Sequence, residues 1–160
     1  MGGTRVTRRA YLLGSLVGLT LIGAGIAPVL AQTEVIQSQD TNVGGVVAEI
    51  TQCKRKDGVL TIKVRLVNNS SKKANIYLTD GYGAYDKYYL TAGDQKYFVL
   101  RDSEGAPLAT DDGNGYANID IEKGASYTWW AKYPAPAAEV TSVNFYTPFA
   151  TPFEDIPITD

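Results

Sequence analysis

Histidine is absent from this 160-residue chain, and cysteine occurs only once, as Cys53. Without histidine, these residues cannot build a Ser-His-Asp triad or a Cys-His catalytic pair. They also cannot build a zinc site rich in histidine or cysteine. A single cysteine has no partner for a disulfide bond within the chain. Stability therefore has to come from packing, for which 11 Tyr, 4 Phe and 2 Trp supply large apolar surfaces.

Clustered positive charge is also missing. The chain has 15 Lys and Arg against 17 Asp and Glu. Three of the arginines lie in residues 1–31, which contain no acid, so residues 32–160 carry a net charge of about −5. Proteins that bind nucleic acid need clustered cations to neutralise phosphates. We therefore expect no nucleic-acid partner.

Residues 1–31 predict a helical export signal, with a basic start, an apolar run and small residues before Gln32, where we expect cleavage. The stretch Thr7-Arg8-Arg9-Ala10-Tyr11 resembles the twin-arginine export motif. This signal predicts a secreted or extracytoplasmic protein, in the periplasm or at the cell surface. A general secretory signal is one alternative. A retained membrane anchor is another, because the run is nearly long enough to span a bilayer; only through this segment do we expect membrane contact.

The pattern after the signal changes from polar and irregular to alternating. Residues 32–45 lack periodicity and predict a flexible lead segment. In residues 59–68, four apolar side chains alternate with Thr61, Lys63 and Arg65. Because successive side chains of a strand face opposite ways, this stretch predicts a strand with one dry face, which needs a second apolar layer.

Similar short runs, separated by turn residues, follow throughout residues 46–160, and none has helical periodicity. The pattern predicts an all-β domain, an antiparallel β-sandwich of roughly seven to nine strands. A closed barrel is the alternative fold. The predicted strands are 46–55, 59–68, 74–78, 87–91, 96–101, 117–121, 126–133 and 140–146, with 147–160 as an extended tail. Cys53 falls either on the wetter face of its strand or, shifted by a β-bulge, on the inner face.

Two adjacent tryptophans give the first candidate for a binding residue. On a strand, Trp129 and Trp130 face opposite ways, and Trp129 shares its face with the apolar residues of the run. Trp130 then lies beside Thr128 and Lys132 on the outer face. There it can serve as an aromatic platform for a sugar ring or a partner protein. The alternative is that the Pro-Phe tail covers Trp130.

A group of tyrosines gives the second candidate. Tyr82, Tyr85 and Tyr89 lie in or beside a glycine-containing loop, together with Tyr88. Tyrosine-rich loops on a rigid sandwich make good contact surfaces, which predicts binding roles for the first three. The alternative is that they cover a sheet edge.

Neither a metal site nor an active site is predicted. Asp111, Asp112, Asn114 and Asp120 offer oxygen ligands, but the twelfth position of an EF-hand loop starting at Asp112 is Lys123 instead of glutamate. A looser calcium site between loops is the alternative to a solvated loop. The solvated loop is the simpler interpretation, and we predict no metal and no cofactor. Hydrolysis by two carboxylates is compatible with the residue types, yet no spacing supports it.

Three stretches resemble a family of uncharacterised bacterial exported proteins that are similar to immunoglobulin-like domains of secreted proteins and lipoproteins. These stretches are residues 97–108 (YFVLRDSEGAPL), 130–136 (WAKYPAP) and 152–158 (PFEDIPI). The strand end at residues 66–70 (LVNNS), with its Asn-Ser turn, also resembles the signature of this family. The shared features are strand ends, turns and a proline cap. The resemblance implies an immunoglobulin-like fold and export, and it supplies no catalytic residue.

Together, these observations predict a non-catalytic, secreted or envelope-associated, immunoglobulin-like module that binds an unknown protein or glycan. One alternative is a structural accessory domain of the cell envelope without a ligand. The other is a small carboxylate-dependent hydrolase.

Overall fold

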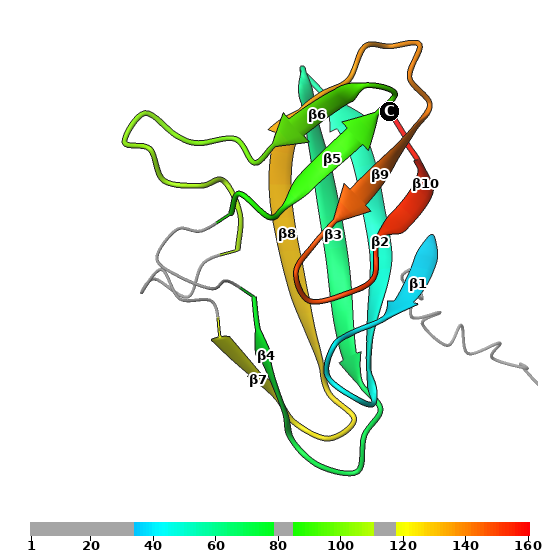
Figure 1. The fold of residues 1–160 in the computed structure, drawn as a ribbon, viewed down its shortest axis with the longest axis vertical. Helices are drawn as coiled ribbons and strands as arrows, with labels where there is room; N and C mark the ends of the chain where they lie inside the picture. The colour runs from blue at the N-terminus through cyan, green and yellow to red at the C-terminus, as the bar shows by residue number, and fades with distance from the viewer. Residues whose placement is uncertain (1–33, 79–84, 111–117) are drawn as a thin grey trace, which may run out of the picture. The chain divides into compact units, whose positions relative to one another are not determined.

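The computed structural model describes residues 34–78, 85–110 and 118–160, which belong to one compact unit, Gln32–Asp160 (Figure 1). The predicted signal peptide, residues 1–31, lies outside the described residues. Within the described ranges all regular structure is β-strand, and no helix there is long and apolar enough to cross a membrane.

The described residues form ten strands, which pair in three antiparallel sheets. The strands are β1 (Gln37–Asp40), β2 (Val46–Lys56), β3 (Val59–Asn68), β4 (Ala74–Tyr77), β5 (Tyr89–Ala92), β6 (Gln95–Phe98), β7 (Asn118–Ile121), β8 (Ser126–Pro134), β9 (Ser142–Tyr146) and β10 (Phe153–Pro157). The order is β1-β2-β3-β8 in the first sheet and β10-β9-β5-β6 in the second. Strands β4 and β7 form a separate two-stranded ladder, at the lower end of the view in Figure 1.

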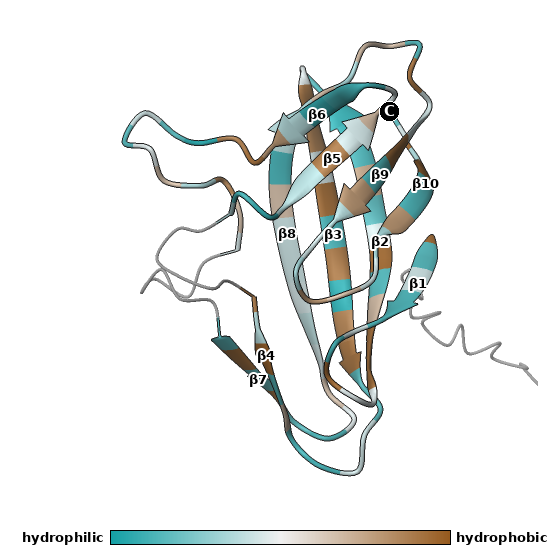
Figure 2. Cartoon of the chain, viewed as in Figure 1, coloured by the Kyte–Doolittle hydropathy of each residue, from teal (hydrophilic) through white to brown (hydrophobic). Residues whose placement is uncertain are grey.

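Strand β3 is the centre of the first sheet, and the predicted strand 59–68 is confirmed residue for residue. It pairs with β2 on one side and β8 on the other. The side chains of its dry face are fully buried: Leu60, Ile62, Val64 and Leu66. Figure 2 shows the corresponding alternation of apolar and polar residues along β3.

The core lies between the two four-stranded sheets. Trp129 of β8 stacks on Phe145 of β9, with 5.7 Å between ring centroids, and on Tyr88, with 5.0 Å. Figure 1 shows β5, β6 and β9 lying across β2, β3 and β8 as a second layer. The arrangement is therefore an all-β, antiparallel sandwich whose sheets are separate ladders, as the alternation of short strands predicted.

The prediction that residues 32–45 form a flexible lead segment is wrong in part, because Gln37–Asp40 form strand β1. This strand pairs in antiparallel register with β2, for example Ser38 with Glu49 and Gln39 with Ala48. It is polar and lies at the edge of the sheet. An edge strand satisfies its backbone by pairing and needs no alternating apolar side chains, so the sequence carried no periodic signal for it.

A β-bulge in β2 decides the position of the single cysteine. The register of β2 on β3 shifts between Ile50 and Gln52, which leaves Thr51 as the extra residue. After the bulge, Cys53 faces inward opposite Ile62 and is fully buried. Burial raises the pKa of the Cys53 thiol to about 12. The thiol is therefore protonated at neutral pH and a poor nucleophile.

Candidate functional site

Trp130 lies on the outer face of the first sheet. Its neighbour Trp129 is fully buried, whereas Trp130 is half-buried, as the alternation along the strand predicted. In the register of β3 on β8, Trp130 lies opposite Lys63, and Lys132 lies opposite Thr61. Polar, outward-facing side chains therefore lie next to Trp130 on β3 and β8.

Backbone contacts on both sides hold Trp130 in place. On one side β8 pairs with β3. On the other side, the Trp130 N–H donates to Thr110 Oγ1 at 2.7 Å, and the Thr110 N–H donates to the Trp130 carbonyl at 2.8 Å. The Lys132 N–H donates to the carbonyl of Leu108 at 2.9 Å. Residues 108–110 therefore extend the sheet beyond β8, a pairing that no alternation in their sequence indicated.

The phenylalanines of the Pro-Phe tail lie in the core instead of over Trp130. Phe149 and Phe153 are fully buried. The Phe149 ring meets the edge of Trp129 at 6.2 Å between centroids, and the Phe153 ring stacks on Phe145 at 6.1 Å. Both rings of the tail therefore pack against the inner faces of the sheets and belong to the core.

Two lysines lie next to Trp130. Lys63 and Lys132 are exposed, and neither forms an ion pair with any described residue. Arg65, two residues after Lys63 on the same face of β3, has its Nη2 atom 2.7 Å from Glu49 Oε2, so that carboxylate is already neutralised. The outer face at Trp130 thus combines a fixed aromatic ring with two unpaired ammonium groups.

The tyrosine cluster predicted for binding is not a single surface. Tyr85 is only 4% exposed, and its hydroxyl donates to the Thr110 carbonyl. The prediction that Tyr85 contacts a ligand is therefore wrong. Tyr88 is fully buried, and its hydroxyl donates to the carbonyl of Leu78. A tyrosine ring can be buried when its hydroxyl finds a partner, and sequence cannot show that partner in advance. Tyr82 lies outside the described residues.

Tyr89 lies on the outer face of the second sheet, so the structure does not bring it together with Trp130. Its ring stacks on Tyr146 of β9 at 4.7 Å between centroids, with 14° between the planes. Lys96 Nζ of β6 lies 3.7 Å from the centroid of the same ring. Because β9 and β6 flank β5 on opposite sides, both faces of the Tyr89 ring are occupied. Phe98 of β6 is 50% exposed beside it.

Sequence reasoning did not identify Phe98 and Tyr146 as part of this surface. The signal was present in the strand parity: Phe98 shares its face with Lys96, and Tyr146 alternates with the buried Phe145. Together with Tyr89, these two residues form a second outward-facing aromatic surface, on the second sheet. Its central ring, Tyr89, is available only at its edge, which suits it less to stacking with a ligand.

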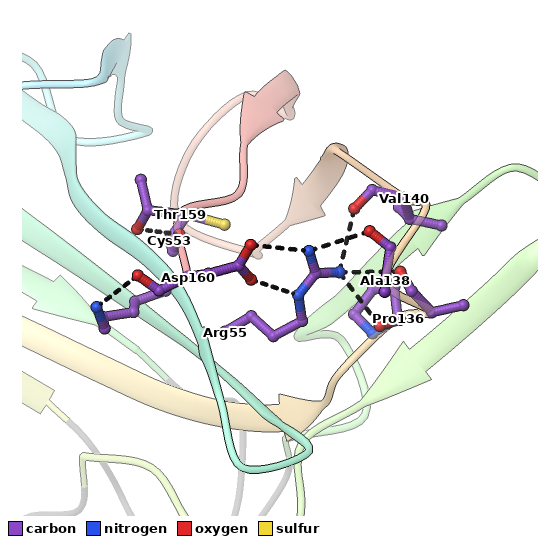
Figure 3. Close-up of polar contacts among 9 residues, drawn as sticks. Cys53, Arg55, Pro136, Ala138, Val140, Thr159 and Asp160 are labelled. Carbon is purple, nitrogen blue, oxygen red and sulfur yellow. Dashed lines mark hydrogen bonds and ion pairs between the residues drawn. The ribbon is translucent and has the colours of Figure 1, made fainter.

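Arg55 at the end of β2 is a polar centre that sequence reasoning missed (Figure 3). Its Nε lies 2.7 Å from Asp160 Oδ1, and its Nη1 donates to the carbonyls of Ala137 and Val140 at 2.9 and 3.2 Å. The Thr159 N–H donates to the Cys53 carbonyl at 2.9 Å. Arg55 therefore holds two distant segments, residues 136–140 and 159–160, against β2.

We expect the Arg55–Asp160 contact to weaken in acid. The hydrogen bond from Arg55 holds the pKa of Asp160 below its ordinary value. A carboxyl with a lowered pKa in the folded state adds stability above its ordinary pKa and loses it as the pH falls through the lowered value. The Thr159 amide should then exchange faster with solvent in Asp160→Asn than in the unchanged protein at neutral pH. Protection factors from NMR hydrogen exchange measure this, and equal protection of the Thr159 amide in the two proteins at neutral pH would contradict it.

The acidic residues of the chain do not gather in one described place. Asp111, Asp112 and Asn114 lie outside the described residues. Asp120 accepts from Asn75 Nδ2 at 2.7 Å and lies 2.6 Å from Lys73 Nζ, and these contacts lower its pKa. Among the described residues, no three His, Cys, Asp or Glu side chains are placed to hold a metal ion.

Two open grooves in the described residues each contain a single carboxylate. One, of about 280 Å³, includes Asp40, Thr41 and Pro148. The other, of about 460 Å³, includes Glu34 and Cys53. A glycosidase needs two carboxyl groups on either side of one scissile bond. These grooves therefore give the hydrolase hypothesis no support.

The described residues define an all-β, antiparallel, sandwich-like protein with an outward tryptophan beside two lysines on one sheet. Comparison of the chain with protein families, with curated proteins and with solved structures finds no match.

Proposed function

We propose that this chain is an exported, non-catalytic, immunoglobulin-like binding module, and that the outer face at Trp130 contacts its ligand, a glycan or a protein. The observation that carries the proposal is the position of Trp130, half-buried on a sheet face instead of packed into the core. Export is inferred from the twin-arginine-like segment in residues 1–31. The immunoglobulin-like assignment comes from the resemblance of its strand ends and turns.

The rigidity of the site favours binding. A tryptophan on a sheet loses little conformational entropy when it meets a ligand, because its backbone is already fixed by β3 and Thr110. Large aromatic side chains are the residues that most often dominate the energy of an interface. A ligand ring or an apolar partner surface that covers the indole would remove its exposed part from water.

A structural accessory domain without a ligand is the second candidate. That hypothesis predicts that the C-terminal tail covers Trp130. The burial of Phe149 and Phe153 in the core leaves that expectation without support. Binding is therefore the function that the geometry supports better.

Trp130→Ala should weaken ligand binding while the fold remains intact. The protein, this variant and Phe98→Ala are applied to a glycan array and to an array of extracytoplasmic proteins. Phe98→Ala is the matched control, because it removes an exposed aromatic ring from the opposite face. We expect ligands that both the protein and the control retain and that Trp130→Ala binds about ten- to thirtyfold more weakly, the effect of losing one dominant aromatic contact. Equal binding by all three would contradict a role for Trp130.

A further inference from the structure

We infer that the ligand at Trp130 is an anionic glycan, a chain of sugar rings that carry carboxylate groups. This inference rests on the proposed function and specifies its ligand. It starts from the pattern of side chains across three strands. One row holds Gln52, Lys63 and Trp130, and the next row holds Lys54, Thr61 and Lys132.

The register places both unpaired lysines within reach of the indole. Lys63 is the direct cross-strand neighbour of Trp130, so their Cβ atoms are about 5 Å apart. Lys132 follows two residues later on the same face of β8, roughly 7 Å along the strand. A lysine side chain is long and flexible, with its charge at the end. A sugar ring stacked on the indole can therefore receive an ammonium group at two of its edges.

The charge balance of this face is opposite to that of the chain. Residues 32–160 carry a net charge of about −5, so an anionic ligand is repelled by the molecule as a whole. On this face, however, Lys63 and Lys132 have no ion-pair partner among the described residues, and Glu49 is neutralised by Arg65. Two unpaired cations beside a fixed aromatic ring therefore give this face a local attraction for anions that opposes the net charge of the domain.

The same pattern disfavours the other ligands. A neutral glycan is recognised mainly by hydrogen-bonding amide and carboxylate groups. The charged outward residues next to Trp130 on β3 and β8 are instead Lys63, Arg65 and Lys132, and the amide of Gln52 lies one strand further away. A nucleic acid needs many cations to neutralise its phosphates, and two unpaired lysines in an acidic domain are too few. Each ring of an acidic polysaccharide carries one carboxylate, and one or two lysines can pair with the ring that stacks on the indole.

The inference is tested by electrophoresis of the protein through gels containing polygalacturonate, its methyl-esterified and therefore uncharged form, or dextran. We expect retardation by polygalacturonate alone, weakening as salt is added, because exposed ion pairs are screened. The double variant Lys63→Gln, Lys132→Gln should bind about three- to tenfold more weakly, and Trp130→Ala at least tenfold more weakly. Lys96→Gln is the matched control, because Lys96 is an exposed lysine beside aromatic rings on the opposite face. It should bind as the unchanged protein does.

The outcomes separate the two proposals. If the esterified polymer binds as tightly and only Trp130→Ala loses binding, the site is a glycan site and the anionic inference is wrong. If the double lysine variant loses binding and Trp130→Ala does not, general charge attraction explains the result and the inference is overturned. If none of the polymers retards the protein while arrayed proteins bind through Trp130, the ligand is a protein and the glycan inference fails. Circular dichroism of each variant shows that the fold is retained.

Discussion

Replacing Trp129 by alanine is expected to lower the free energy of unfolding by about 3–5 kcal/mol, the usual cost of truncating a buried aromatic side chain. Trp129 is fully buried and bridges both sheets. Its ring stacks on Phe145 and Tyr88 and meets the edge of Phe149. The truncation removes all three contacts and leaves a cavity at the centre of the sandwich. Because a domain of this size is stabilised by about 5–15 kcal/mol, the variant should be close to unfolding.

Two further variants make the prediction specific, with urea denaturation as the measurement. Trp130→Ala, one residue further along, should cost less than about 1 kcal/mol, because its side chain lies on the outer face. Trp129→Phe should cost less than Trp129→Ala. It keeps an aromatic ring and removes an indole N–H that has no hydrogen-bond partner among the described residues. Similar losses for Trp129→Ala and Trp130→Ala would contradict the opposite orientation of the two side chains.

The parts of the fold that could be predicted are those with alternating side chains. In β3 and β8 one face meets the core and the other meets water, so alternation gave their position and the orientation of both tryptophans. The polar edge strand β1 has no such contrast, and it depends on backbone pairing with β2. The bulge at Thr51 was one of two alternatives for Cys53, and only the register of β2 on β3 decided between them.

The candidate site was predictable to a similar degree. Trp130 follows from strand parity, but the lysine opposite to it belongs to β3, and cross-strand neighbours depend on register. Tyr85 failed as a candidate because its burial depends on a carbonyl 25 residues away, at Thr110. Distant partners of this kind are decided by the tertiary fold and leave no local pattern in the sequence.

The second large effect is expected at Asn68, the last residue of β3 and a fully buried polar side chain. Its Nδ2 donates to the carbonyls of Lys72 and Ile121, each at 2.8 Å. Its Oδ1 accepts from the N–H of Ser70 at 2.9 Å and from the Ser70 hydroxyl at 2.7 Å. One amide group thus makes four hydrogen bonds and joins the end of β3 to the end of β7 and to the loop that leads into β4.

Asn68→Ala should therefore lower the free energy of unfolding by about 2–4 kcal/mol, because buried groups that lose a hydrogen-bond partner each cost about 1–3 kcal/mol. Asn68→Asp keeps the shape and the acceptor for Ser70 but turns an oxygen towards the carbonyls of Lys72 and Ile121. It should be at least as unstable as Asn68→Ala at neutral pH, since its charge would be buried. The exposed neighbour provides the control: Asn69→Ala should stay within about 0.5 kcal/mol of the unchanged protein. Urea denaturation measures all three, and amide hydrogen exchange should show the loss first in β4 and β7. A stable Asn68→Asp would mean that shape, and not the donated hydrogen bonds, holds this corner of the domain together.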